Sequence, residues 1–231
     1  MTRPDGLPSG EDKARTVQAM FDRIAPRYDR LNRIMTLGMD AGWRRKSVAS
    51  LRLRRGATVV DVACGTGDFC RELQSQGMEP VGFDVSFGML SMASTSAPLV
   101  QGDGLRLPLG DASADGLTCG FALRNVVDLK ALFEESARVL KPGAGAAYLE
   151  TAQPDNAVLK VGHRVYFHKV VPALGGWLSD KEAYRYLPRS TAYLPPRAAL
   201  LALLTEAGFA DVKVRFFGLG AVQLLTGTKI G

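Results

Sequence analysis

The clearest chemical signal in this sequence is a glycine-rich turn that follows a run of β-branched residues. The turn reads Asp61-Val-Ala-Cys-Gly-Thr-Gly-Asp68, and a helical pattern follows it. Glycines at 65 and 67 let the backbone approach a ligand closely, and the first N–H groups of the helix can bind a carboxylate or a phosphate. A dinucleotide-binding turn would have a third glycine where this chain has Cys70, which disfavours NAD. The turn therefore predicts a different, nucleotide-like cofactor.

Two carboxylates follow the turn, each at the end of a further apolar run. Asp84 lies 19 residues after Gly65 and can accept hydrogen bonds from two ribose hydroxyls. Asp103 can accept from an adenine amine while Leu105 packs on the ring. The alternative for Asp84 is a surface residue that caps a helix, and Asp103 taken alone is more simply a turn residue, but their order along the chain predicts a site for S-adenosyl-L-methionine. The predicted cofactor-binding residues are Asp61, Gly65, Thr66, Gly67, Asp84, Val85, Asp103, Gly104 and Gly120.

Only a parallel sheet would bring these turns to one edge, and the hydrophobic pattern predicts such a sheet. Strand patterns at 58–63, 80–84, 98–101, 114–120 and 145–150 alternate with helical patterns that run to 76, over 87–94 and over 128–140. This alternation implies right-handed crossovers and helices on both faces of the sheet. A helix at 196–207 and strands at 211–217 and 221–228 close the chain. We expect a Rossmann-like α/β fold whose seven-stranded sheet is mostly parallel, with an antiparallel C-terminal hairpin strand.

The rest of the chain is assigned to one domain with two helical additions. Residues 1–12 are rich in Pro and Gly and predict a flexible tail, and residues 13–231 predict a single domain. Apolar residues recur at helical spacing over 13–52, where Pro26 and Gly38 divide two or three short amphipathic helices; these are expected to form a lid. Residues 155–195 predict a helical insertion on the substrate side, with Tyr166, Phe167, Tyr184 and Tyr186 as candidate channel residues.

Composition excludes several classes of protein. The 231 residues include 29 Lys and Arg against 23 Asp and Glu, a net charge of +6, and are 46% hydrophobic, which excludes disorder. No apolar run is long enough to span a membrane, and three cysteines without a secretory leader predict a cytoplasmic protein. No Cys or His cluster has metal-ligand spacing, so no metal is expected. The first 60 residues hold 13 basic and 6 acidic side chains, so the excess charge lies on the predicted lid.

The ordered cofactor motifs, with Arg138-Val-Leu-Lys-Pro-Gly143, resemble the class I methyltransferases. Further stretches resemble one family among these, the ubiquinone/menaquinone biosynthesis C-methyltransferases, over about Lys13 to Lys229. These stretches are Met20–Asp29, Leu37–Arg45, Gly120–Asn125, Glu182–Ser190 and Gly218–Lys229. The chain departs from the family at four positions. Gly104 stands where Ala is usual, which is a small change. Gly120 and Ala122 stand where Ser and Gly are usual, and Leu225 where His is usual. The last three departures concern the shape of the quinol pocket.

The resemblance implies S-adenosylmethionine-dependent C-methylation of a polyprenyl hydroquinone, and the form of the cofactor turn favours demethylmenaquinol as the acceptor. Arg124 is the predicted catalytic residue, because a guanidinium can hold a phenolate or an ordered water that takes the proton. A structural ion pair with Asp128 is the plainer interpretation. Tyr28 is expected to contact the cofactor or the quinol, with helix packing as the alternative, and Asn125 to orient its neighbours.

Partners and alternatives follow from the same observations. A lipid quinol is the expected substrate, and the basic lid is expected to rest on the anionic inner face of the cell membrane. One alternative is a methyltransferase of secondary metabolism that acts on a soluble phenolic or prenyl substrate, which Gly120, Ala122 and Leu225 favour. Binding to nucleic acid is suggested only by the pI of about 9.4, and no specific nucleic-acid partner is expected. A homodimer is left open.

Overall fold

The computed structural model describes residues 8–152 and 190–231. The predicted helical insertion and its four aromatic candidates lie almost wholly outside these ranges, as does most of the predicted N-terminal tail.

The fold is built on one seven-stranded sheet with the strand order β3-β2-β1-β4-β5-β7-β6. Strands β1 to β5 pair in parallel, and β7 runs antiparallel to both β5 and β6, as the sequence predicted. The strands are β1 (Thr58–Val62), β2 (Glu79–Asp84), β3 (Leu99–Gln101), β4 (Ala114–Gly120), β5 (Leu140–Thr151), β6 (Phe209–Phe217) and β7 (Val222–Lys229). The carboxyl ends of β1, β2 and β4 therefore lie side by side at one edge.

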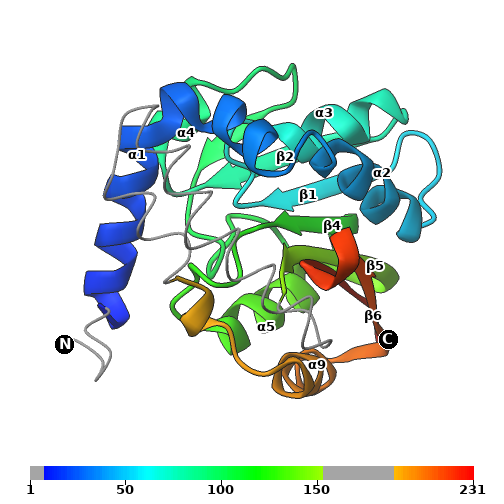
Figure 1. Ribbon diagram of the computed structural model, residues 1–231. Coiled ribbons are helices and arrows are strands. Elements are labelled where there is room, and N and C mark those ends of the chain that lie inside the picture. The colour runs from blue at the N-terminus through cyan, green and yellow to red at the C-terminus, as the bar shows by residue number, and fades with distance from the viewer. Residues whose placement is uncertain (1–7, 153–189) are drawn as a thin grey trace.

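Helices cover both faces of the sheet (Figure 1). They are α1 (Gly10–Met35), α2 (Asp40–Ser50), α3 (Asp68–Ser75), α4 (Phe87–Ser91), α5 (Leu129–Val139) and α9 (Arg197–Glu206), with short 3-10 turns at Thr191–Tyr193 and Gly218–Gly220. Alternate residues of a strand point to opposite faces, so β5 serves two cores. Tyr148 packs with α5 and α9, and Leu149 packs with Trp43 of α2 and Phe69 of α3.

Helix α1 corrects the prediction of short helices divided by Pro26. Proline usually breaks or kinks a helix, because it lacks an N–H and its ring meets the preceding turn. Here one helix of 26 residues runs through Pro26, and buried apolar side chains lie on both sides of the proline. Only Gly38 separates two helices. The helix also begins at Gly10, so the last residues of the predicted tail are helical.

Two further boundaries differ by three residues or more from those predicted. Strand β5 begins at Leu140 rather than at residue 145, because α5 passes directly into the strand. Helix α4 ends at Ser91, three residues earlier than predicted. The N-cap of α5 is Asp128, whose side chain accepts a hydrogen bond from the Ala131 N–H at 3.0 Å.

Candidate active site

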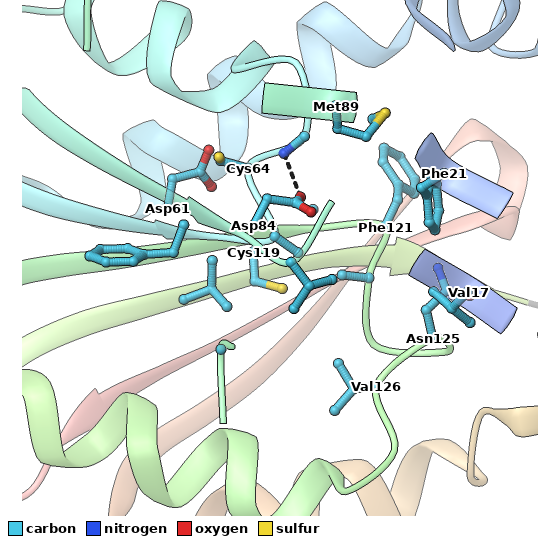
Figure 2. Close-up of a pocket in the computed structure, with 18 of the residues that line it drawn as sticks. Val17, Phe21, Asp61, Cys64, Asp84, Met89, Cys119, Phe121, Asn125 and Val126 are labelled. Carbon is cyan, nitrogen blue, oxygen red and sulfur yellow. Dashed lines mark hydrogen bonds between the residues drawn. The ribbon is translucent and has the colours of Figure 1, made fainter. Parts of the chain in front are cut away.

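A cavity of about 320 Å³ opens where β1, β2 and β4 end, and α1 forms its opposite wall (Figure 2). Its size falls within the range of small-molecule sites. Ten of the predicted site residues line it: Tyr28, Asp61, Gly65, Thr66, Asp84, Val85, Asp103, Gly104, Gly120 and Asn125. The described residues that line the cavity do not include Gly67 or Arg124.

The glycine-rich turn has the conformation that glycine permits. Gly65 and Gly67 have φ angles of 57° and 82°, in the left-handed region. A Cβ at Gly67 would lie 2.7 Å from the Thr95 side chain, and one at Gly65 would lie 3.0 Å from the Met89 methyl carbon. Gly67 is the N-cap of α3, so it shapes the turn from behind the cavity. The turn thereby presents backbone and the start of a helix to a ligand.

Asp84 joins two of these turns. Its Oδ2 accepts a hydrogen bond from the Gly65 N–H and its Oδ1 accepts one from the Ser86 N–H, both at 2.8 Å. Burial raises the pKa of Asp84, and the two N–H donors oppose part of that rise. The carboxylate is therefore fixed on the cavity wall, where it can accept from the hydroxyls of a ribose.

Asp61, a residue of β1, lies deeper in the site, and its side chain bonds to the neighbouring strand β4. Its carboxylate accepts from the Thr118 hydroxyl at 2.8 Å and from the Cys70 thiol at 3.5 Å. Burial raises its pKa to about 7, although both hydrogen bonds oppose the rise. Burial also raises the pKa of the nearby Cys64 thiol, so this cysteine packs as a neutral side chain. Asp61 is placed to compensate a cation in the cavity.

The third turn forms the rim of the cavity. The Leu105 N–H donates to Asp103 Oδ1 at 2.9 Å, which leaves the other carboxylate oxygen at the rim. A Cβ at Gly104 would lie 2.6 Å from a Val62 methyl carbon, so only glycine fits there. Leu105 also lines the cavity, as the adenine interpretation requires.

The departures from the family pattern are explained in part by packing. A Cβ at Gly120 would lie 2.7 Å from the Phe69 ring, so Phe69 occupies the space that a serine would need. Leu225 is fully buried in the core beneath α5 and α9, and it is not among the described residues that line the cavity. Of the four departures, Gly104, Gly120 and Ala122 line the cavity and Leu225 does not.

The wall formed by α1 supplies cavity-lining residues that were not predicted from the sequence. Val17, Gln18 and Phe21 line the cavity together with Tyr28. The rings of Phe21 and Tyr28 meet edge to face at 6.0 Å. Burial raises the pKa of Tyr28 to about 12, although the charge of Arg124 opposes this. Tyr28 therefore stays protonated near neutral pH and can donate a hydrogen bond. The helical spacing of these residues was the available signal, but it did not distinguish side chains that face a ligand from side chains that pack in the core.

Arg124 follows β4 as predicted, but it is held in a buried ion pair and is not among the described residues that line the cavity. Its Nη1 donates to Glu150 Oε1 at 2.5 Å and to the Phe121 carbonyl at 2.7 Å, and its Nε donates to the Ser190 hydroxyl at 3.2 Å. The structural ion pair expected with Asp128 is formed instead with Glu150 at the end of β5, because Asp128 caps α5. Arg124 thus fastens the loop after β4, whose next residue, Asn125, faces the cavity.

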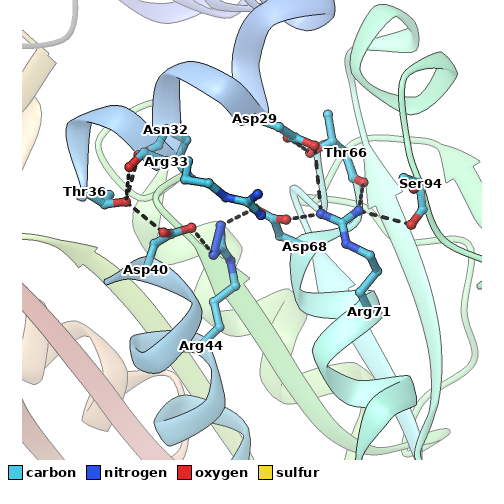
Figure 3. A network of polar contacts seen from close by, with 10 residues as sticks. All are labelled: Asp29, Asn32, Arg33, Thr36, Asp40, Arg44, Thr66, Asp68, Arg71 and Ser94. Atoms are coloured by element: carbon cyan, nitrogen blue, oxygen red, sulfur yellow. Dashed lines mark hydrogen bonds and ion pairs between the residues drawn. The ribbon is translucent and has the colours of Figure 1, made fainter. Parts of the chain in front are cut away.

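A second buried arginine, Arg44 of α2, lines the cavity and was not predicted (Figure 3). Its guanidinium donates to Asp40 at 2.5 Å and to Asp68 at the start of α3. Asp68 also accepts from Arg71. The sequence could not show that Arg44 is buried, because the neighbouring Arg45 is of the same type and is exposed. A guanidinium beside the first turn of α3 suits the carboxylate of an amino-acid ligand.

The donor set therefore fits S-adenosylmethionine along its length. Arg44 and the turn before α3 suit the carboxylate, Asp61 the ammonium group and Asp84 the ribose, and the rim at Asp103 suits the adenine. Together with the strand order, this arrangement defines the class I S-adenosylmethionine-dependent methyltransferases.

Comparison with known proteins agrees with this class. A methyltransferase from Thermotoga maritima, described as a possible histamine N-methyltransferase, superposes with a TM-score of 0.66 at 20% identity, over 92% of this chain and 99% of its own. A phosphoethanolamine N-methyltransferase from Haemonchus contortus, in complex with S-adenosylhomocysteine, superposes with a TM-score of 0.62 at 14% identity, over 93% and 60%. At these identities the likeness shows the fold.

Relatives found by sequence similarity identify one family within this class. The model of the ubiE/COQ5 methyltransferase family matches residues 9–229. A demethylmenaquinone methyltransferase from Roseiflexus castenholzii is 42% identical over 97% of this chain and 98% of its own length. A ubiquinone/menaquinone biosynthesis C-methyltransferase from Syntrophotalea carbinolica is 37% identical over 91% and 92%. The chain belongs to the ubiE/COQ5 methyltransferase family.

Proposed function

We propose that this enzyme methylates a ring carbon of a polyprenyl hydroquinone and that its acceptor is demethylmenaquinol. The observation that carries the proposal is the 42% identity to a demethylmenaquinone methyltransferase over 97% of this chain. The cavity supports it, because apolar and aromatic side chains of α1 face the polar cofactor wall. A flat aromatic acceptor would lie between these two walls.

The cofactor, when bound, supplies a methyl group on a positively charged sulfur. The chain's residues have to hold the acceptor beside that group, exclude water and favour loss of a phenolic proton. Val17 and Phe21 would exclude water from the α1 side, and Asn125 would orient the acceptor from the loop after β4.

Tyr28 and Arg124 would divide the work on the acceptor hydroxyl. A phenol has a pKa near 10, so a nearby cation helps it to ionise. The charge of Arg124 acts at the Tyr28 hydroxyl, where it opposes the rise that burial causes in that pKa. The same charge would favour the phenolate of an acceptor bound beside Tyr28, which would donate a hydrogen bond to it. Arg124 would thus act as a positioning residue that also contributes charge.

The test uses purified protein, methyl-labelled S-adenosylmethionine and a set of acceptors. We expect label on a ring carbon of demethylmenaquinol, less on a demethylated ubiquinol precursor, and none on simple soluble phenols. Mass spectrometry of the extracted product checks the position of the label. Absence of label on every reduced quinone would refute the proposal. Labelling of soluble phenols alone would support a methyltransferase of secondary metabolism, for which Gly120 and Ala122 at the cavity are the remaining signs.

A further inference from the structure

Exposed hydrophobic side chains gather at the edge of the sheet that carries the cavity. Most of the large ones lie at this edge, on loops, at strand ends or at the start of a helix: Leu37, Met39, Val85, Phe87, Val127, Phe216 and Leu219. Val85 and Val127 are explained because they line the cavity. Phe216 lies against the Arg197 guanidinium, 4.4 Å from the centre of its ring, and Phe87 belongs to helix α4. The remaining three, Leu37, Met39 and Leu219, lie on two loops away from the cavity, and we call them the apolar edge patch.

The two loops that carry this patch lie side by side. Leu37 and Met39 belong to the loop between α1 and α2, and the Met39 carbonyl accepts from the Trp43 N–H in the first turn of α2. Leu219 belongs to the turn between β6 and β7, and a Cβ on its neighbour Gly218 would lie 3.3 Å from the Trp43 ring. Trp43 therefore joins the two loops, although they are far apart in the sequence.

Both leucines have an unfavourable backbone conformation. Leu37 and Leu219 have φ angles of 51° and 56°, in the left-handed region that favours Gly and Asn. Their side chains are nonetheless 75% and 79% exposed. Folding stability gains nothing from a large apolar side chain that is strained and exposed. The two leucines therefore point to a contact outside the described part of the chain.

The surroundings of the patch are basic. Lys46 of α2 and Arg215 of β6 both lie over the Phe217 ring, at 5.5 and 5.4 Å from its centre, and both are exposed. Within the described ranges neither forms an ion pair with a carboxylate. Arg33, one turn before Leu37, is also exposed. The nearby carboxylate of Asp40 is buried against Arg44, so it does not offset this charge at the surface.

From these observations we propose that the apolar edge patch docks on an anionic lipid membrane, with Leu37, Met39 and Leu219 inserted between headgroups and Lys46 and Arg215 on the phosphates. The inference rests on the proposed function, because a lipid acceptor would then reach the cavity from the same edge. Apolar insertion beside cations is how peripheral proteins bind such surfaces. No helix in the described ranges is long and apolar enough to cross a membrane.

A second copy of the chain fits this patch less well. A two-fold contact places each patch against itself, so Lys46 and Arg215 would face the same cations of the other copy. Like charges that face each other across an interface oppose association. An anionic surface instead complements them.

The test measures binding of the full chain to vesicles of phosphatidylcholine alone and of phosphatidylcholine with phosphatidylglycerol. We expect wild type to prefer the anionic vesicles. L37N with L219N should weaken this binding at least tenfold, since two apolar insertions are lost. Asn accepts the left-handed conformation, so thermal stability should be unchanged or higher. K46Q with R215Q should reduce binding mainly to the anionic vesicles, by about tenfold or more.

Matched controls come from the opposite edge of the sheet. I230N removes an apolar side chain of comparable exposure, and R54Q removes an exposed cation of the same basic segment. Both should bind like wild type. Equal binding of wild type to neutral and anionic vesicles, or unchanged binding by L37N with L219N, would overturn the proposal. So would a wild-type dimer that L37N with L219N converts to a monomer.

A short-chain, water-soluble acceptor separates this proposal from the proposed function. Methylation of that acceptor without vesicles, combined with no membrane binding, would refute the docking surface and leave the function standing. Anionic vesicle binding without methylation of any reduced quinone would support the docking surface and refute the function.

Discussion

The two walls of the cavity are held in place by different kinds of contact. On the sheet wall, turns that follow neighbouring strands bond directly to each other, as when the Gly65 N–H donates to Asp84. On the α1 wall, side chains reach across to turns far away in the sequence. The Gln18 amide donates to the Val85 carbonyl at 2.9 Å, and Asp22 accepts from the Ser86 hydroxyl at 2.5 Å and from the Gly88 N–H at 2.8 Å.

The difference divides the chemistry between the walls. The sheet wall carries the carboxylates and the turn that suit the cofactor, in positions that local sequence dictates. The α1 wall carries Val17, Phe21 and Tyr28, which would meet the acceptor. Substitutions in the sheet wall should therefore affect folding and cofactor binding strongly, whereas substitutions that loosen α1 should act more weakly on stability.

The largest effect is expected at the buried Arg124–Glu150 pair, which fastens the loop of the sheet wall. Arg124→Ala leaves the fully buried Glu150 without its partner, and should lower the free energy of unfolding by about 3–5 kcal/mol. Cofactor affinity should persist while turnover falls, because Arg44 and the carboxylates that suit the cofactor lie on other elements. Urea unfolding, calorimetric titration of the cofactor and methyl transfer measure the three quantities.

Two further variants keep this test informative if Arg124→Ala does not fold. Arg124→Met combined with Glu150→Gln removes both charges and should unfold less readily than Arg124→Ala alone. Arg138→Ala is the matched control, because its ion pairs are partly exposed, and it should cost about 1 kcal/mol. Turnover near that of wild type in a folded Arg124→Ala would remove Arg124 from the mechanism.

A smaller, pH-dependent effect is expected at Asp61. Its pKa of about 7 in the folded chain lies above the ordinary value of 3.8, so ionisation opposes folding. The stability that its protonated form contributes is complete below pH 4 and is lost as the pH rises through 7. Asp61→Asn should therefore lose less stability between pH 5 and pH 8 than wild type, by roughly 2–3 kcal/mol.

Urea unfolding of the cofactor-free protein at the two pH values measures this difference. Asp103→Asn is the matched control, because it removes an exposed carboxylate from the rim of the same cavity. Equal pH slopes for wild type and Asp61→Asn would contradict the prediction.

The smallest effect on stability is expected from loosening α1. Asp22→Ala removes an acceptor from Ser86 and Gly88 and should cost roughly 1 kcal/mol, because Asp22 is exposed. Hydrogen exchange of the α1 amides should become faster, and the Kd for the cofactor should rise severalfold. Glu11→Ala, an exposed residue of the same helix, should change neither quantity. Unchanged exchange in Asp22→Ala would show that apolar packing alone holds the helix.

The contrast between the walls also explains how far the sequence could be interpreted. The strand order and the turns at Asp61, Asp84 and Asp103 were predicted because strand periodicity and glycine spacing are local signals. The passage of α1 through Pro26 was not predicted, because the helix is stabilised by packing along its whole length. The low helix propensity of proline favoured a break at Pro26.

The partners of two arginines could not be predicted from the sequence, for a related reason. The partner of Arg124 is Glu150, 26 residues away on the next strand, and pairing at that distance depends on the register of β4 and β5. Arg44 lines the cavity because α2 turns that side chain inward between Asp40 and Asp68. No local pattern separates a buried arginine of this kind from a solvated one. The cofactor could therefore be assigned from the sequence, whereas the partner of Arg124 and the inward orientation of Arg44 required the packed structure.

The contacts of α1 have a consequence for the order of events in folding. Lys13 donates to the Val126 carbonyl at 2.7 Å, and the Tyr193 hydroxyl donates to the Pro8 carbonyl at 2.6 Å. These partners lie 113 and 185 residues apart in the chain. A ribosome makes α1 before these partners, so the binding surface of α1 is complete only after residues 126 and 193 have emerged. Helix α1 is therefore made early relative to its partners and docks late, and the cavity closes only after those partners have folded.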